Sequence, residues 1–163
     1  MPPQLLLDPC RLDLARVVAD QEAIRKVNLQ RFEMEHLNAI VFLDTVEHVI
    51  AGYKDVRDDE FWVRGHLPGH PILPGVIMCE AAAQLASYYC NTQMLMGEGF
   101  IGFGGMENVR FRTLVHPGDR LLMIGKATRI HRRQTTWNVQ GFVGPVMAFH
   151  ADVLGVPLQL KGT

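Results

Sequence analysis

The sequence lacks two features that would place it in a specialised class: a long apolar run and an ordered set of cysteines. No stretch of the 163 residues reaches the roughly 18 consecutive apolar residues that a membrane-spanning helix needs. The N-terminal MPPQLLLDPC has no basic segment ahead of its short apolar run, so no secretory signal is expected. Cys10, Cys79 and Cys90 form no CxxC pair, which predicts a reduced, cytosolic protein without a disulfide or zinc framework.

An excess of one charge is also missing. The 16 basic and 17 acidic residues give a formal net charge of −1. Such a balance provides no general attraction to nucleic acid or to a membrane surface, so neither is expected as a partner. Any recognition of a charged partner has to come from a local patch. The length and the 48% hydrophobic content are those of one folded, soluble domain.

The first third of the chain changes from a helical to a β texture. Residues 8–36 carry apolar side chains at helical spacing with charges between them, which predicts an amphipathic helix. From about residue 39 the chain reads AIVFLDTVEHVIAGYKDV, whose β-branched residues predict strand, with a turn or bulge at Ala51-Gly52. A further short strand is expected over 61–63.

A stiff loop and a long helix follow. The segment 65–75, GHLPGHPILPG, has three prolines and three glycines, so it is predicted to be a loop with a largely fixed backbone. The next stretch, VIMCEAAAQLASYYCNTQML, has four alanines and no internal glycine or proline. It predicts a helix of about 16–20 residues that starts near Pro74, where proline suits the first helical position, and that Gly97 and Gly99 end.

The remainder indicates an α+β fold. Alternating apolar and polar residues predict antiparallel strands over 100–112, 120–130, 134–143 and 147–153. The helix is apolar on most sides, so it has to be covered on most sides. We therefore expect a long central helix wrapped by an antiparallel β-sheet over 39–163. Residues 1–38 are expected to form a helical extension that packs on this domain.

Residues that can carry chemistry gather around the start of the predicted helix. His66 lies on the stiff loop, which suits a side chain that must hold one direction. Glu80 and Gln84 are four residues apart and share a helix face, where desolvation would favour the neutral, proton-donating form of a carboxyl group. The first amides of the helix, at Gly75 and Val76, lack an intrahelical acceptor and lie at the positive end of the helix dipole. The pattern predicts a base, an acid and an oxyanion site.

Plainer interpretations of the same residues remain open. A single histidine before a proline loop is more often structural than catalytic, and a single glutamate on an alanine-rich helix usually faces solvent. However, the helix carries no other charged residue between Gly75 and Asn91, which argues against a solvated face. His66 and His70 cannot form a helical metal pair because Pro68 lies between them, and no ligand cluster completes a site. Neither a metal nor another cofactor is expected.

At this point the sequence resembles a known family. The run GHLPGHPILPGVIMCEAAAQL (65–85) closely resembles the signature of the bacterial β-hydroxyacyl-acyl-carrier-protein dehydratases, in which a His-aromatic-Pro-Gly loop leads to PGV…EAxAQ. A second block, FGGMENVRFRTLVHPGDRL (103–121), resembles the strand of that family that ends in a Pro-Gly-Asp turn. The resemblance covers about residues 40–154 and implies a hot-dog fold.

The resemblance also implies roles for individual residues. His66 matches the catalytic histidine and Glu80 the catalytic acid. Gly75, which Val76 follows, matches the glycine whose amide faces the thioester oxygen, and Gln84 matches the glutamine near the acid. Family members are homodimers, often assembled as trimers of dimers, in which the histidine of one protomer meets the glutamate of the other. The chain departs from the family at Leu67, where phenylalanine is usual.

The implied function is dehydration of a (3R)-3-hydroxyacyl chain, held on the phosphopantetheine arm of acyl carrier protein, to the trans-2-enoyl thioester in fatty acid biosynthesis. The apolar candidates for an acyl tunnel are Leu67, Met78, Leu85, Tyr88 and Phe103. The basic candidates for docking the acidic carrier are Arg110, Arg112, Arg132 and Arg133. A hot-dog thioesterase, a polyketide-type dehydratase and a non-catalytic module that binds acyl thioesters remain alternatives.

Overall fold

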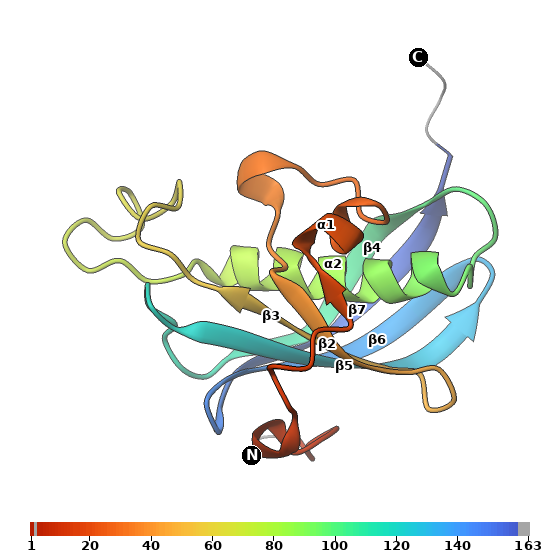
Figure 1. Ribbon diagram of the computed structural model, residues 1–163, viewed down its shortest axis with the longest axis horizontal. Helices are drawn as coiled ribbons and strands as arrows, with labels where there is room; N and C mark the ends of the chain where they lie inside the picture. Colours follow the sequence, from red (N-terminus) through yellow and green to blue (C-terminus); the bar gives the residue numbers. More distant parts are fainter. Residues whose placement is uncertain (2, 160–163) are drawn as a thin grey trace.

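The computed structural model describes residues 1 and 3–159, which form a curved sheet around one long helix (Figure 1). The antiparallel sheet has seven strands in the order β1-β2-β3-β5-β6-β7-β4. The strands are β1 (Ala19–Asp20), β2 (Ala39–Asp44), β3 (Val49–Asp55), β4 (Phe100–Phe111), β5 (Arg120–His131), β6 (Gln134–Val143) and β7 (Val146–Leu158). The central helix is α2 (Gly75–Thr92), and a short helix, α1 (Gln21–Arg25), precedes it. This is the hot-dog fold, and the expectation of a helix wrapped by a sheet is confirmed.

Helix α2 forms where the sequence predicts it. Pro74 is its N-cap residue, and the helix then runs for 18 residues. Ala81 and Ala82 are fully buried against the sheet, where their short side chains allow close approach. The length of α2 lies within the predicted 16–20 residues, but the helix ends at Thr92, before Gly97 and Gly99, and Met94 already has a left-handed backbone with a φ of 49°. The buried ring of Tyr89 packs on Trp137 of β6, with 4.8 Å between the ring centroids.

Of two local predictions in the first half of the chain, one is wrong and the other is confirmed as a bulge whose extra residue lies on the neighbouring strand. Residues 61–63 form turns and not a strand. The irregularity predicted at Ala51-Gly52 is a bulge in the pairing of β2 with β3, and its extra residue lies on β2, between Ile40 and Phe42. The glycine is needed there for space, because a Cβ atom at position 52 would lie 2.8 Å from the carbonyl oxygen of Ala39.

The prediction of an amphipathic helix over 8–36 is also wrong. That segment holds two 3₁₀ turns, Pro9–Arg11 and Phe32–Met34, together with β1 and α1. Three aspartates break it up by accepting hydrogen bonds from nearby backbone amides. Asp8 bonds the amide of Cys10, Asp13 that of Ala15, and Asp20 that of Ala23. Such local bonds offer the backbone an alternative to a continuous helix.

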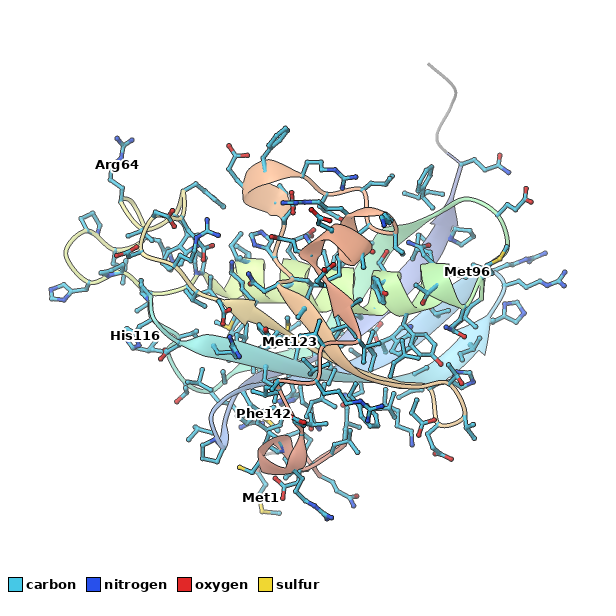
Figure 2. All side chains as sticks on the ribbon, viewed as in Figure 1. Met1, Arg64, Met96, His116, Met123 and Phe142 are labelled. Carbon is cyan, nitrogen blue, oxygen red and sulfur yellow. The ribbon has the colours of Figure 1, made fainter. Side chains whose placement is uncertain are left out.

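The N-terminal segment covers both sides of the domain. Its first part packs on the outer face of the sheet, where Leu6, Leu7, Leu12 and Leu14 contact an apolar cluster around Phe142. Figure 2 shows Phe142 between the sheet and the arm that carries Met1. Further along, Ile24 joins the core around α2, and the Asn28 side chain donates to the backbone oxygen of Gln84. Helix α2 is therefore enclosed by the sheet on one side and by this segment on the other.

Candidate active site

His66 is held by hydrogen bonds within its own loop. Its Nδ1 lies 2.8 Å from the carbonyl oxygen of Ile72, and its backbone amide donates to the carbonyl oxygen of Trp62 at 2.8 Å. Because a carbonyl oxygen can only accept, Nδ1 carries the hydrogen of the neutral ring. The lone pair is then on Nε2, and the half-buried ring presents an oriented base.

Glu80 is oriented by Gln84. The Gln84 Nε2 donates to Glu80 Oε1 at 2.8 Å and to the carbonyl oxygen of Met34 at 2.7 Å. The Gln84 Oε1 accepts from the backbone amide of His36 at 3.0 Å. These two backbone contacts fix which way the Gln84 amide points, so Glu80 Oε1 must be an acceptor. A proton on this carboxyl group therefore belongs on Oε2.

The start of α2 offers free backbone donors. The Pro74 carbonyl accepts from the amides of Ile77 and Met78. Within residues 1 and 3–159 the amides of Gly75 and Val76 have no acceptor, as the helix geometry requires. The ring of Phe111 covers Gly75 so closely that a Cβ atom there would lie 2.6 Å from the ring Cζ. The position therefore has no room for a side chain.

A small cavity of about 60 Å³ opens beside Glu80, between α2 and strands β4, β6 and β7. The helix contributes a face of small side chains at helical spacing from the acid. The lining comprises Gln30, Glu80, Ala83, Ala86, Ser87, Cys90, Ile101, Gly102, Phe103, Thr135, Trp137, Val153, Leu154 and Gly155.

Of the five residues proposed for an acyl tunnel, this cavity includes Phe103 alone. Met78, Leu85 and Tyr88 are buried in the core around α2, and Leu67 lines a separate groove. Large apolar side chains fill space, whereas a cavity is left where side chains are short. A better signal in the sequence is the row Ala83, Ser87 and Cys90, which shares a helix face with Glu80, together with the strand glycines.

Within residues 1 and 3–159, the two candidate catalytic side chains share no hydrogen bond, and His66 is not part of the cavity at Glu80. The groove beside Leu67 is lined by His70, Pro71, Ile72, Leu114, His116 and Pro117, and it shares no residue with the cavity at Glu80. Figure 1 shows the loop before α2 extending beyond the end of the helix, and Figure 2 shows Arg64 and His116 at that same end of the molecule. His66 thus does not line the cavity that opens beside the acid of its own chain.

The four candidate docking arginines form two separate groups. Arg110 and Arg112 are exposed and flank Phe111, close to the start of α2. Arg132 and Arg133 lie in the turn between β5 and β6, at the opposite end of the sheet (Figure 1). Arg110 and Gln140 both pair with His150 of β7, so they lie at the same level of the sheet. Arg133 comes seven residues before Gln140, which at about 3.3 Å per residue places it roughly 23 Å from the level of Arg110. One chain thus does not present them as one patch.

The structure gives little support for a cysteine nucleophile or a metal ion at this site. Burial raises the pKa of the Cys79 thiol, so a reactive thiolate is disfavoured there. Among residues 1 and 3–159, no group of three or more histidine, cysteine, aspartate or glutamate side chains is arranged to hold a metal ion. In the same part of the chain, no helix is both long and apolar enough to cross a membrane.

Comparison with known proteins decides the family. The profile of the FabA-like domain matches residues 28–147. The chain belongs to the FabA-like family. The resemblance seen in the His-Leu-Pro-Gly loop and the Pro-Gly-Asp turn is thereby confirmed. The match starts within the N-terminal segment, ahead of β2, and ends in β7.

Curated relatives of this FabA-like chain are dehydratases by name. The 3-hydroxyacyl-[acyl-carrier-protein] dehydratase FabZ of Legionella pneumophila (strain Lens) is 31% identical over 136 residues, which cover 80% of this chain and 89% of the relative. The protein of the same name from Koribacter versatilis is 33% identical over 142 residues, covering 85% and 89%.

Solved structures agree on the fold. The ApeI:P dehydratase heterocomplex of Xenorhabdus doucetiae matches with a TM-score of 0.69 at 12% identity, covering 83% of this chain and 91% of the other. Cj0977, a σ28-regulated virulence protein of Campylobacter jejuni, matches with a TM-score of 0.65 at 15% identity, covering 88% and 95%. At such identities the likeness concerns the fold and not the activity.

Proposed function

We propose that the protein dehydrates (3R)-3-hydroxyacyl thioesters of acyl carrier protein to trans-2-enoyl thioesters, as the names of its curated relatives indicate. The observation that carries the proposal is the contact between Gln84 and Glu80 at the cavity. It leaves one carboxyl oxygen available to give a proton beside a space lined largely by apolar side chains. The pathway would be fatty acid biosynthesis in the cytoplasm, and the sequence implies no cofactor.

Removal of the C2 proton is assigned to His66. Its Nε2 is the free ring nitrogen, because Nδ1 donates to the carbonyl of Ile72. As that proton leaves, negative charge develops on the thioester oxygen, which the free amide of Gly75 at the start of α2 would stabilise. One donor of this kind typically contributes about 10²–10³ in rate. The amide of Val76 lies next to it and is free as well.

Departure of the 3-hydroxyl group is assigned to Glu80. Its Oε2 gives a proton to the hydroxyl oxygen as the C3–O bond breaks, while the C2–H electron pair becomes the C2–C3 double bond. The products are the enoyl thioester and water. His66 then carries one extra proton and Glu80 lacks one, so a proton transfer through water returns both groups to their starting forms. General acid or base help of this kind typically contributes about 10²–10⁴ per group.

Completion of the site requires a second copy of the chain. Strand β4 is an edge of the sheet in the described part of the chain, and its residues Ile101 to Phe103 line the cavity at Glu80. Two copies that pair along β4 would extend the sheet and bring a second loop towards each acid. The site would then consist of His66 from one protomer and Glu80 from the other. A homodimer is the minimal unit of this proposal, and a trimer of dimers would contain six such sites.

The carrier protein is proposed to dock at the end of the molecule where α2 starts. Arg110 and Arg112 lie there, because they precede and follow Phe111, whose ring covers Gly75. In a two-fold dimer through β4, the start of one strand lies beside the end of the other. The turn that carries Arg132 and Arg133 of one protomer is thereby placed at the Arg110 end of its partner. All four arginines could then face one acidic carrier with its phosphate-bearing arm.

The decisive experiment follows enoyl thioester absorbance while the protein dehydrates 3-hydroxyacyl-carrier or hydrates crotonyl thioester. We expect His66→Ala and Glu80→Gln each to lower kcat by about 10²–10⁴ with the fold retained. His70→Ala, an exposed histidine on the same loop, is the matched control and should keep its activity. Release of free thiol without hydration would indicate a thioesterase, and binding without turnover would indicate a non-catalytic module. Near-normal turnover by His66→Ala would refute the assignment.

A further inference from the structure

A buried ion pair lies behind the loop that carries His66. The Lys54 Nζ, at the end of β3, is 2.8 Å from Glu60 Oε2, and the two side chains are only 5% and 7% exposed. Removing two charges from water is costly unless further hydrogen bonds satisfy them. Glu60 meets this condition, because its other oxygen accepts from the amide of Arg57 at 2.9 Å.

The carboxylate of Glu60 also connects to the catalytic loop. Its Oε2 accepts from the indole Nε1 of Trp62 at 3.0 Å, and the Trp62 side chain is buried. The carbonyl oxygen of Trp62 in turn accepts from the amides of Gly65 at 3.1 Å and His66 at 2.8 Å. The ion pair, the indole of Trp62 and the backbone carbonyl of the same residue thus connect the sheet at Lys54 to the backbone of His66.

The same pair neighbours the segment that holds the acid. His36 is 1% exposed, and neither ring nitrogen has a hydrogen-bond partner among residues 1 and 3–159. Its burial, and then the charge of Lys54, lower the pKa of this imidazole to about 4, so the ring is neutral next to the ion pair. The backbone amide of His36 donates to Gln84, which in turn holds Glu80.

We infer that the Lys54–Glu60 ion pair is a positioning element for His66. This inference rests on the proposed function, in which His66 is the base. Neither charged side chain lines the cavity at Glu80; both line a separate hollow beside Arg57, and the hydrogen bonds of Glu60 lead from there to the loop. Although burial acts to raise it, the pKa of Glu60 is lowered by Lys54 and the Arg57 amide. The carboxylate is therefore ionised at neutral pH, and its bonds to the loop are charge-assisted.

The test replaces both charges at once, because a single substitution would leave one buried charge unpaired and threaten folding. The variant Lys54→Met/Glu60→Gln removes the ion pair and keeps side chains of similar size. Arg57→Met/Asp59→Asn is the matched control. Those side chains form an ion pair of the same length, 2.8 Å, in the same turn, but they are 62% and 69% exposed and do not bond Trp62.

Two measurements are made on folded protein of each variant: kcat and KM for dehydration, and the hydrogen-exchange rate of the His66 amide. We expect Lys54→Met/Glu60→Gln to lower kcat about 10–100-fold with KM changed less than about threefold, since misplacing a reacting group by about 1 Å has an effect of this size. Exchange at the His66 amide should accelerate at least about tenfold, as expected when local opening becomes easier. The control should match the unmodified protein in both.

The outcomes separate this inference from the proposed function. If kcat per folded molecule is unchanged in Lys54→Met/Glu60→Gln, or if the His66 amide exchanges at its original rate, the positioning role is refuted. A role in stability alone would lower the unfolding temperature and leave kcat per folded molecule as before. The proposed function is tested independently by His66→Ala in the same assay. This variant lacks the proposed base, so its loss of activity does not depend on which residues position the loop.

Discussion

The side chain of Gln84 donates to Glu80 Oε1 at 2.8 Å while its own oxygen accepts from the backbone of His36. Gln84 is only 3% exposed, and its amide group thereby links the proposed acid to the N-terminal segment. The arrangement fixes the direction of the hydrogen bond at Glu80 Oε1, so a proton on this carboxyl group belongs on Oε2.

Gln84→Met tests this arrangement. Methionine has a similar length and no amide, so Glu80 loses its donor, and the backbone groups of Met34 and His36 lose their partner. We expect kcat to fall about 10–100-fold, as for other misplaced catalytic groups. Leaving the backbone amide of the buried His36 without a partner should also lower the free energy of unfolding by about 1–3 kcal/mol. Urea denaturation and steady-state kinetics measure these effects, and Gln93→Met, at an exposed position after α2, is the control. An unchanged kcat would contradict the orienting role.

His36 should make the stability of the protein depend on pH. Burial and Lys54 lower the pKa of its imidazole from 6.5 to about 4, so the folded state binds fewer protons than the unfolded state between these values. The contribution of His36 is fully present above pH 6.5 and is lost as the pH falls towards 4, with a slope of up to about 1.4 kcal/mol per pH unit.

His36→Leu should remove this slope, whereas His70→Leu, at an exposed position, should retain it. The measurement is the free energy of unfolding in urea at several pH values between 4 and 6.5. Parallel curves for His36→Leu and the unmodified protein would show that this imidazole is not the group responsible.

Gly75 and Phe111 should show coupled effects. A Cβ atom at position 75 would lie 2.6 Å from the ring of Phe111, so Gly75→Ala must displace that ring. Overpacking of this kind typically lowers the free energy of unfolding by about 1–3 kcal/mol. Phe111→Leu in the same chain should recover part of that loss, which a double-mutant cycle of unfolding measurements would detect. Additive effects would mean that the clash is relieved in another way.

Ala83 is expected to limit the length of the acyl chain. It lines the cavity one helical turn from Glu80. Ala83→Leu would fill space that a long chain needs, and would lower kcat/KM for long acyl substrates by about 10–200-fold, the usual effect of a small change in an apolar pocket. The four-carbon substrate serves as the internal control and should be turned over normally. An equal loss for both substrates would point to a disturbed acid instead.

Charge reversal at Arg110 and Arg112 tests carrier docking. Arg110→Glu/Arg112→Glu should raise KM for the carrier-linked substrate about tenfold or more, because close charge pairs at an interface contribute over 1 kcal/mol. KM for a small thioester mimic should not change. Arg132→Glu/Arg133→Glu is assayed in parallel and should act likewise if the dimer brings both groups together. Equal effects on carrier-linked and small substrates would argue against docking.

The loop and the helix that contain the candidate site could be predicted from the sequence because their conformations are determined locally. Three prolines and three glycines over 65–75 exclude regular structure, and an alanine-rich stretch then begins at a proline. The four-residue spacing of Glu80 and Gln84 likewise places them on one face whatever surrounds the helix. The alternating strands were found for the same reason, and β6 has the predicted bounds, Gln134–Val143.

The tertiary structure decided the features that join residues distant in the sequence. The partners of the Gln84 amide lie about fifty residues earlier, at Met34 and His36, in a segment whose apolar spacing resembled a helix. The hydrogen bonds of its aspartates and its packing on both sides of the domain stabilise a different conformation from the helix that the local pattern predicts. The pairing of Lys54 with Glu60 and the cavity beside Ala83 likewise depend on how strands and helix pack. Local preferences specify elements one at a time, whereas a buried charge or a cavity is defined by everything packed around it.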